Sequence, residues 1–453
     1  MFIKQSLLPL FAVGMAINPL SASTADAHRQ SDLVVGAGRA GIELPAGLLP
    51  MQGFGVEHDQ LQARVLLLDD GKSKAAVVVL DMTSLSGGTI AQVREVVKEV
   101  AGVSPEKVLV VASHTFSAPH ILPPGIGPAG HNQDEIAKTD RFAASLVTAV
   151  RQAVITAAKT ARPATIGFAE GFSNVNVNRN VKTAKGWWLG AGESGPSDKS
   201  VLTLYFEDST HHPIAVLANY AVQSAVMDQV IVANGKKAIT ADLAGAAMEY
   251  VERRLGPEVV SLFLTGSAGD QVPTYAARRH VLDSEGNDQI VDMGADAYPL
   301  IALQGERLGG AVLTSLSKQA RVPSTNLTVA TASIALAGQE RPRDLTQIKP
   351  TLSYTYKIVG ASEAPYTILS IGDVAIVGVQ VELSSTTGAW IRAHSPFKHT
   401  LVATMVNGAA KYLPDEENYR NFSYEAMNSS YAPGSAEILA QAIIRSLKQI
   451  SAR

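Results

Sequence analysis

The sequence predicts an α/β (α+β) fold in which mixed β-sheets are flanked by helices. Apolar strand-like segments alternate with amphipathic helical segments along most of the chain, as they do in strand–helix–strand units. Two turns, Asp70-Gly71 and Gly372-Asp373, each join two apolar runs directly and therefore require antiparallel strand pairs. The strands must run in both directions, and we expect the helices to lie outside the sheets.

Composition supports a large buried core and excludes several classes of site. The chain has 453 residues, of which 46% are hydrophobic and 17% charged, which is ample for such a core. The formal net charge of -3 gives no basic surface for nucleic acid or anionic membrane, so no nucleic-acid partner is expected. Cysteine is absent, which excludes disulfides, thiolate nucleophiles and cysteine-based zinc sites.

Residues 1–27 have the pattern of a secretory signal peptide. Lys4 gives the positive start, residues 7–17 form the apolar core, and Ala25-Asp26-Ala27 offers a small-x-small cleavage site. An N-terminal membrane anchor is the alternative, but prolines interrupt the apolar run. No later stretch reaches about 18 uninterrupted apolar residues, so no transmembrane segment is expected after cleavage. We expect one domain over residues 28–453, in a periplasmic or secreted protein.

The elements follow from periodicity and from turn residues. Residues 108–111 form a short apolar strand, and Gly102 is placed to end the helix before it as a C-cap. The stretch 185–200 has the composition of a loop and carries two tryptophans, and 275–300 is charged; both are expected to be irregular. Strands are predicted at 62–68, 74–80, 108–112, 165–168, 201–206, 214–222, 259–264, 327–336 and 366–381, and helices at 90–100, 142–159, 303–319 and from 435.

A glycine motif near the N-terminus does not indicate nucleotide binding. Gly36, Gly38 and Gly41 match G-x-G-x-x-G, which in a dinucleotide-binding fold opens a helix. Here Pro45 and Pro50 interrupt the next stretch, so no such helix is predicted. We therefore reject a Rossmann fold.

The strand at 108–112 leads into a polar stretch that contains two histidines. Ser113, His114, Thr115 and Ser117 follow it directly, and His120 comes after Pro119. A buried strand that delivers an imidazole to its C-terminal end is a common way to support a functional residue. The alternative is a hydrogen-bonded structural histidine. We expect the strand ends at 113, 223, 265 and 382 to converge on one cleft.

The segment HTFSAP (114–119) resembles the T-H-T-H-S-G/A-P motif of the neutral (alkaline, non-lysosomal) ceramidases and their shorter bacterial relatives. The resemblance implies the fold of the ceramidase catalytic domain, without the C-terminal immunoglobulin-like domain of the larger enzymes. In that family zinc is held by two His, a Glu and a Tyr. His114, Glu382 and Tyr412 stand at three of these positions, and Gln223 stands at the position of the second histidine. A neutral amide is a weak zinc donor, so weak or partial zinc occupancy is expected.

Further positions resemble family elements but also have plain structural alternatives. Arg179, in Asn-Arg-Asn, matches an element of the active site and is a candidate for catalysis and substrate binding; it is also a candidate surface arginine. Trp187 and Trp188 are candidates for a substrate wall or lid, or for loop packing. Asp242 fits either a catalytic acid or a helix N-cap. Asp270, in TGSAGDQVPT (265–274), is a candidate general base.

Two functions follow from these assignments. The first is a metal-dependent amidohydrolase that acts on N-acyl amides, including sphingolipid-like ones, through metal-bound water with Asp270, Asp242 or Asp81 as base. The second is a non-catalytic exported binding protein that has kept the ceramidase cleft. Phe116, Gln223 and Val272 replace a histidine, a zinc ligand and the nucleophilic serine of the family, so serine-based hydrolysis is not available. A small-molecule or lipid amide is the expected ligand in both cases.

Overall fold

The structure is a computed structural model that describes residues 33–452 except 284, 286 and 343. These residues fall within one compact unit. The predicted signal peptide, residues 1–27, lies outside the described residues. Among the helices that are described, none combines the length and the apolar character that crossing a bilayer requires.

The largest sheet has nine strands and is mixed. Its order is β12-β10-β9-β6-β1-β3-β4-β5, with β16 paired to β6. The pairs β4–β5 and β10–β12 are parallel, and the others are antiparallel. The strands are β1 (Val34–Gly41), β3 (Gln62–Asp69), β4 (Lys74–Leu80), β5 (Val108–Ala112), β6 (Arg162–Phe172), β9 (Ser200–Asp208), β10 (Pro213–Tyr220), β12 (Val260–Thr265) and β16 (Ala320–Arg321).

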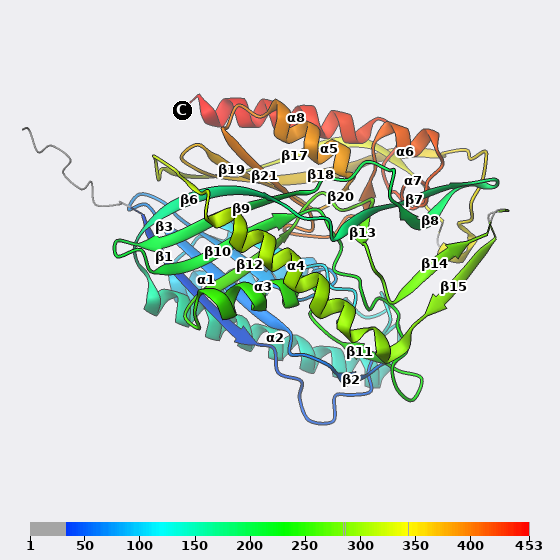
Figure 1. The fold of residues 1–453 in the computed structure, drawn as a ribbon, viewed down its shortest axis with the longest axis horizontal. Coiled ribbons are helices and arrows are strands. Elements are labelled where there is room, and N and C mark those ends of the chain that lie inside the picture. Colours follow the sequence, from blue (N-terminus) through cyan, green and yellow to red (C-terminus); the bar gives the residue numbers. More distant parts are fainter. Residues whose placement is uncertain (1–32, 284, 286, 343, 453) are drawn as a thin grey trace, which may run out of the picture. The chain divides into compact units, whose positions relative to one another are not determined.

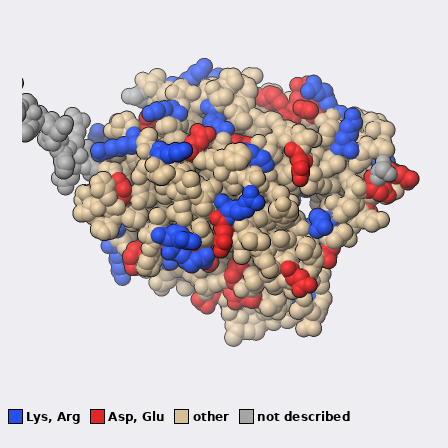
Figure 2. Space-filling view, viewed as in Figure 1, with Lys and Arg blue, Asp and Glu red and all other residues tan. Residues whose placement is uncertain are grey.

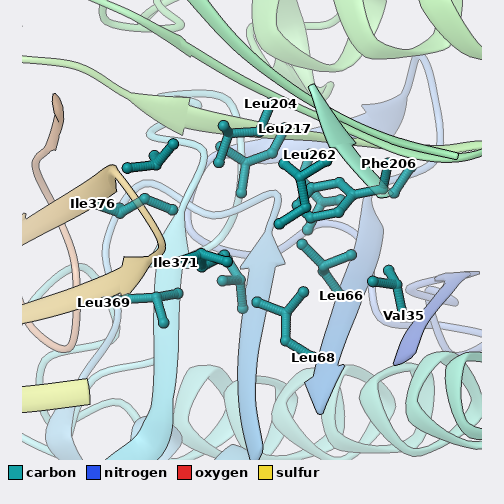
Figure 3. Packing of buried hydrophobic residues seen from close by; sticks show 14 of the residues in the cluster. Val35, Leu66, Leu68, Leu204, Phe206, Leu217, Leu262, Leu369, Ile371 and Ile376 are labelled. Atoms are coloured by element: carbon teal, nitrogen blue, oxygen red, sulfur yellow. The ribbon is translucent and has the colours of Figure 1, made fainter. Parts of the chain in front are cut away.

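A second sheet of four strands packs face to face against the first. It consists of β17 (Leu327–Gln339), β18 (Ile358–Ile371), β19 (Val374–Val379) and β21 (His399–Ala403), and β19–β21 is its parallel pair. The core between the sheets is drawn in Figure 3, where Leu66 of β3 and Leu204 of β9 lie across from Leu369 of β18 and Ile376 of β19. This double-sheet core explains why strands such as β4, β10, β12 and β19 read as continuous apolar runs, since they are buried on both faces.

Helices cover the two outer faces, as the sequence predicts, so the layers run helix–sheet–sheet–helix. Figure 1 shows α8 at the top and α2 at the bottom, with both sheets between them. On the nine-stranded sheet, α1 and α2 pack over β3, β4 and β5, while α3 and α4 pack over β9, β10 and β12; on the four-stranded sheet lie α5 and α8. The bounds are α1 (Gly87–Ala101), α2 (Gln133–Thr160), α3 (Asp242–Leu255), α4 (Tyr298–Leu316), α5 (Ser385–His394) and α8 (Ser435–Ser451).

Lys, Arg, Asp and Glu side chains are interspersed on the molecular face shown in Figure 2.

Smaller elements lie at the ends of the sheets. The short strands are β2 (Phe54–Glu57) with β11 (Lys237–Ile239), β13 (Gln271–Pro273) with β7 (Asn176–Thr183) and β8 (Gly186–Gly192), β14 (Arg278–Leu282) with β15 (Asp288–Asp292), and β20 (Glu382–Leu383) with β22 (Tyr412–Leu413). The short helices are α6 (Glu416–Arg420), α7 (Tyr424–Met427), η1 (Pro105–Lys107), η2 (Gly294–Ala297) and η3 (Leu345–Gln347).

The structure corrects the two stretches that were expected to be irregular. Within 185–200, β8 pairs antiparallel with β7, and Trp188 lies in a small apolar cluster with Ile348 and Met427. Within 275–300, β14 and β15 form an antiparallel hairpin whose residues are half-buried or exposed. Without a buried face, this hairpin has no alternating apolar pattern from which to predict it. The helix predicted from residue 303 begins earlier, at Tyr298.

The N-terminal glycines serve helix packing. Gly36 and Gly38 lie in β1, which pairs antiparallel with β3. A Cβ atom at Gly36 would lie 2.0 Å from the carbonyl oxygen of Ala157, and one at Gly38 would lie 2.2 Å from that of Ala153, both in α2. The glycines therefore let the long helix lie directly on the strand, and the motif has no part in nucleotide binding.

Candidate functional site

The segments that follow four strands meet at one end of the sheets, as expected from the sequence. After β5 and β10, Thr115 and Ser224 form a parallel bridge. The Thr265 hydroxyl at the end of β12 donates to the carbonyl oxygen of Ser113 at 3.1 Å. Gly269 donates its backbone N–H to the carbonyl oxygen of Leu383 in β20 at 2.8 Å. These contacts bring His114, Gln223 and Glu382 together.

His114 has a fixed orientation in this cluster. Its backbone has φ of 63°, an uncommon left-handed conformation for a residue other than glycine. Ring atom Nδ1 lies 2.6 Å from the carbonyl oxygen of Thr83, and Nε2 lies 3.2 Å from Glu382 Oε2. A carbonyl can only accept, so Nδ1 carries a proton and Nε2 is directed at the carboxylate. Phe116 packs edge-on against the ring, at 4.7 Å between centroids.

Glu382 connects His114 to Gln223. The side-chain amide Nε2 of Gln223 donates to Glu382 Oε2 at 3.1 Å, and its Oε1 accepts from Arg179 Nη1 at 3.5 Å. Burial acts to raise the pKa of Glu382, but His114, Lys411 and Arg179 outweigh burial and hold that pKa below its ordinary value. Glu382 is therefore an ionised carboxylate at neutral pH, surrounded by donors.

Arg179 occupies the other side of the cluster. Its Nη1 donates to the Tyr412 hydroxyl at 3.2 Å, and its Nε lies 3.0 Å from Glu425 Oε1. The guanidinium also lies 5.4 Å from the ring centroid of Tyr424, within the range of a cation–π contact. Burial acts to lower the pKa of Arg179, but Tyr412 and Glu425 outweigh burial and raise that pKa above its ordinary value. The residue therefore stays charged. Burial and Glu382 raise the pKa of Tyr412, which keeps its hydroxyl protonated.

Asp270 lies behind the cluster. Its carboxylate accepts from the backbone N–H of Ser385 at 2.9 Å, from Gln271 Nε2 at 3.0 Å, from the Ser385 hydroxyl at 3.2 Å and from Asn178 Nδ2 at 3.3 Å. Its carbonyl oxygen accepts from the backbone N–H of Arg179. Among the described residues, the Asp270 side chain has no hydrogen bond to His114 or Glu382. These hydrogen bonds indicate that Asp270 links β7 to the first turn of α5, which is a structural role and not that of a general base.

Asp270 should make stability depend on pH in a defined direction. Burial raises the pKa of Asp270 to about 7, above its ordinary value of 3.8. Between these two pH values the folded chain binds more protons than the unfolded chain, so rising pH should lower the free energy of unfolding by roughly 2–4 kcal/mol. Asp270→Asn should remove this contribution. Urea unfolding at pH 4.5 and 7.5 measures it, and an equal pH response of the two proteins would contradict it.

The other two acids also have structural partners. The Asp242 carboxylate accepts three backbone N–H groups, from Val226, Met227 and Leu243, at 2.6–3.0 Å. Asp242 is the first residue of α3 with φ of 55°, one position past the N-cap, so the N-cap assignment is wrong. Burial raises the pKa of Asp242 to about 6. Asp81 pairs with the buried Arg64 at 3.0 Å.

The two tryptophans lie on strand β8. Trp188 is buried, with 5% of its surface exposed, and packs with Ile348 and Met427. Its ring meets that of Tyr424 edge-on at 5.9 Å, so it supports the aromatic residue that covers Arg179. Trp187 is half-buried on the opposite face of the strand. The packing alternative therefore describes Trp188, and the substrate-wall role of Trp187 stays a prediction.

Sequence reasoning did not assign Glu425 a role, although its buried carboxylate is the acid that pairs with Arg179. The adjacent Tyr424 and Glu425 could have pointed to this role. An acid that follows Tyr412 by 13 positions and lies beside an aromatic residue is a candidate partner for Arg179.

The donor set of the cluster does not fit a closed zinc site. Tetrahedral zinc takes three or four strong ligand atoms. Among the described residues of this cluster, only His114 Nε2 and Glu382 Oε2 are strong zinc ligands that point toward a common position. Gln223 turns its NH₂ group to Glu382, and flipping the amide would set that group against the Arg179 guanidinium. The Tyr412 hydroxyl is protonated and accepts from Arg179. Across the described residues, no three His, Cys, Asp or Glu side chains are grouped as a metal site.

The fold and the cluster define a class: a two-sheet, helix-covered α+β fold with polar residues gathered where the strands end. No family model and no curated protein matches the chain. Among solved structures, it matches the crystal structure of neutral ceramidase from Pseudomonas aeruginosa at a TM-score of 0.70 and 16% identity, over 91% of this chain and 74% of that one. A ceramidase complexed with C2 matches at a TM-score of 0.69, with the same identity and coverage. The predicted ceramidase-like fold is confirmed.

Proposed function

We propose that this chain binds N-acyl amides at the cluster of His114, Arg179, Gln223, Glu382 and Tyr412, called here the Arg179 cluster, and that it does so as a non-catalytic relative of the ceramidase fold. Export, predicted from residues 1–27, is part of the proposal. Two solved structures that share the fold are named as ceramidases, and that name denotes an N-acyl lipid amide as the substrate. The fold likeness supports the choice of ligand class.

The observation that carries the proposal is the unused part of the Arg179 guanidinium. Arginine has five N–H donors. Nη1 makes two long contacts and Nε forms the ion pair with Glu425, while Nη2 has no hydrogen bond to any described residue. The side chain is 11% exposed, so solvent reaches it. A carbonyl oxygen is a natural acceptor for such a donor.

Two features favour binding over hydrolysis. Val272, at the position of the family's nucleophile, lies in β13 opposite Val177 and has no group that attacks a carbonyl. The amide of Gln223 holds both Glu382 and Arg179, so the position of the family's second histidine is used for a hydrogen-bond bridge.

Calorimetric titration with N-hexanoylethanolamine tests the proposal. The chain should bind it saturably, and Arg179→Lys should weaken binding at least about tenfold, because one charged hydrogen bond and the planar donor geometry are lost. Arg253→Lys, on the exposed surface of α3, is the matched control and should bind as the unaltered chain does. Tryptophan fluorescence offers a second readout, because Trp188, one of three tryptophans, contacts the Tyr424 ring. Absence of saturable binding to the unaltered chain would refute the proposal.

The second candidate is the metal-dependent amidohydrolase predicted from the sequence. One observation favours it: the Nδ1 contact with Thr83 directs His114 Nε2 at Glu382 Oε2, as backbone carbonyls orient imidazole ligands in metal sites. Release of hexanoate in the same titration mixture, with and without added zinc, separates the two. Turnover that depends on zinc would favour the hydrolase.

A further inference from the structure

Glu425 is a buried acid that no part of the proposed binding function uses. It lies in α7 with 1% of its surface exposed. Its Oε1 is 3.0 Å from Arg179 Nε, yet neither carboxylate oxygen nor Nε has hydrogen-bond geometry with any described residue. The attraction between the two side chains is therefore coulombic, without an aligned N–H···O bond.

Among the described residues, Arg179 is the cation that forms an ion pair with Glu425. Its sequence neighbour Tyr424 meets the ring of Tyr412 edge-on at 6.1 Å, and the Arg179 guanidinium lies near both rings. Removing a carboxylate from water costs several kcal/mol unless a partner compensates it. Glu425 and Arg179 thus form a pair whose net charge is zero.

This pairing changes what the free Nη2 group of Arg179 can accept. A ligand at Nη2 meets a donor whose positive charge is already balanced by Glu425, which lies 3.0 Å from Nε. A bound carboxylate would be a second negative group on a guanidinium that Glu425 already pairs. An uncharged carbonyl takes the same hydrogen bond without that repulsion.

We infer that Glu425 is a specificity-determining residue that makes Arg179 select an uncharged amide carbonyl over a carboxylate. The inference rests on the proposed function. It also gives such a site a reason to keep a buried acid, because the hydrolysis products of N-acyl amides include fatty acid anions that share the acyl chain. Selectivity between amide and acid then comes from charge.

The test compares N-hexanoylethanolamine with hexanoate at pH 8, where hexanoate is ionised. The unaltered chain should bind the amide at least about tenfold more tightly than the anion. Glu425→Gln keeps the side-chain volume and removes the charge, so hexanoate affinity should rise about 10–100-fold while amide affinity changes far less. Glu425→Asp keeps the charge and should keep the preference.

Glu437→Gln is the matched control, since Glu437 accepts from the backbone N–H of Glu416 and does not contact Arg179. Its amide-to-anion ratio should equal that of the unaltered chain. A ratio that Glu425→Gln leaves unchanged, with a thermal melt showing folded protein, overturns the inference and leaves amide binding standing. Equal affinity of the unaltered chain for both ligands also overturns the inference. This result does not depend on whether Glu425→Gln folds. Binding of neither ligand refutes the proposed function and the inference together.

Discussion

Arg179→Ala should lower the free energy of unfolding by about 3–5 kcal/mol, because it leaves a buried carboxylate without its partner. Glu425 is 1% exposed and has no hydrogen bond among the described residues, so the ion pair with Arg179 is the polar contact that the substitution removes. Urea unfolding followed by circular dichroism measures the loss.

Two comparisons make this result specific. Arg253→Ala removes an exposed arginine paired with Glu249 at 3.5 Å, and a surface pair of this kind contributes about 0–1 kcal/mol. Adding Glu425→Leu to Arg179→Ala should recover much of the loss, because no charge is then left buried. A loss for Arg179→Ala as small as that for Arg253→Ala would mean that water reaches Glu425.

Gln223→His should raise zinc affinity about 10–100-fold, the range typical of changes in the shell around a metal. The substitution replaces an amide, whose NH₂ group faces Glu382 at 3.1 Å, with an imidazole that can present a lone pair. Together with His114 and Glu382 it would give three strong donors. Competition with a chromophoric chelator measures the affinity, with zinc as the added metal.

His114→Ala in the Gln223→His background is the control and should abolish the gained affinity. If Gln223→His binds zinc no better than the unaltered chain, the cluster is not a ceramidase zinc site that lost one ligand. The second candidate function would then lose its support, while amide binding through Arg179 would be unaffected.

Much of the fold was predictable because most strands are buried on both faces. A strand such as β4, with Lys74 at its start and a continuous apolar run after it, is recognisable from composition alone. The turns at Gly71 and Gly372 both have positive φ, which explains why glycine marked them. The hairpin β14–β15 was missed because its strands have no buried face, and without flanking apolar runs the glycine in the connecting sequence 283–287 did not stand out as a hairpin turn.

The candidate site was predictable in position and less so in its interactions. The strand-end pattern placed His114, Gln223 and Glu382 together, because strand order fixes where chain ends meet. Which atom of Gln223 faces Glu382 depends on Arg179, 44 positions earlier in the chain. Likewise, the sequence marked Asp242 as an acid but could not show that the backbone N–H groups of Val226 and Met227, 16 and 15 positions earlier, donate to its carboxylate.

The register of β20 against β22 places Glu382 directly beside Tyr412, and this cluster draws on segments far apart in the chain. His114 and Glu382 are 268 positions apart, and Arg179 and Tyr412 are 233 apart. Contacts of such long range form late, after the loop-closure entropy between them has been overcome. Ligand binding at the Arg179 cluster would therefore appear only once the last third of the chain has joined both sheets, which makes it a reporter of complete folding during synthesis or refolding.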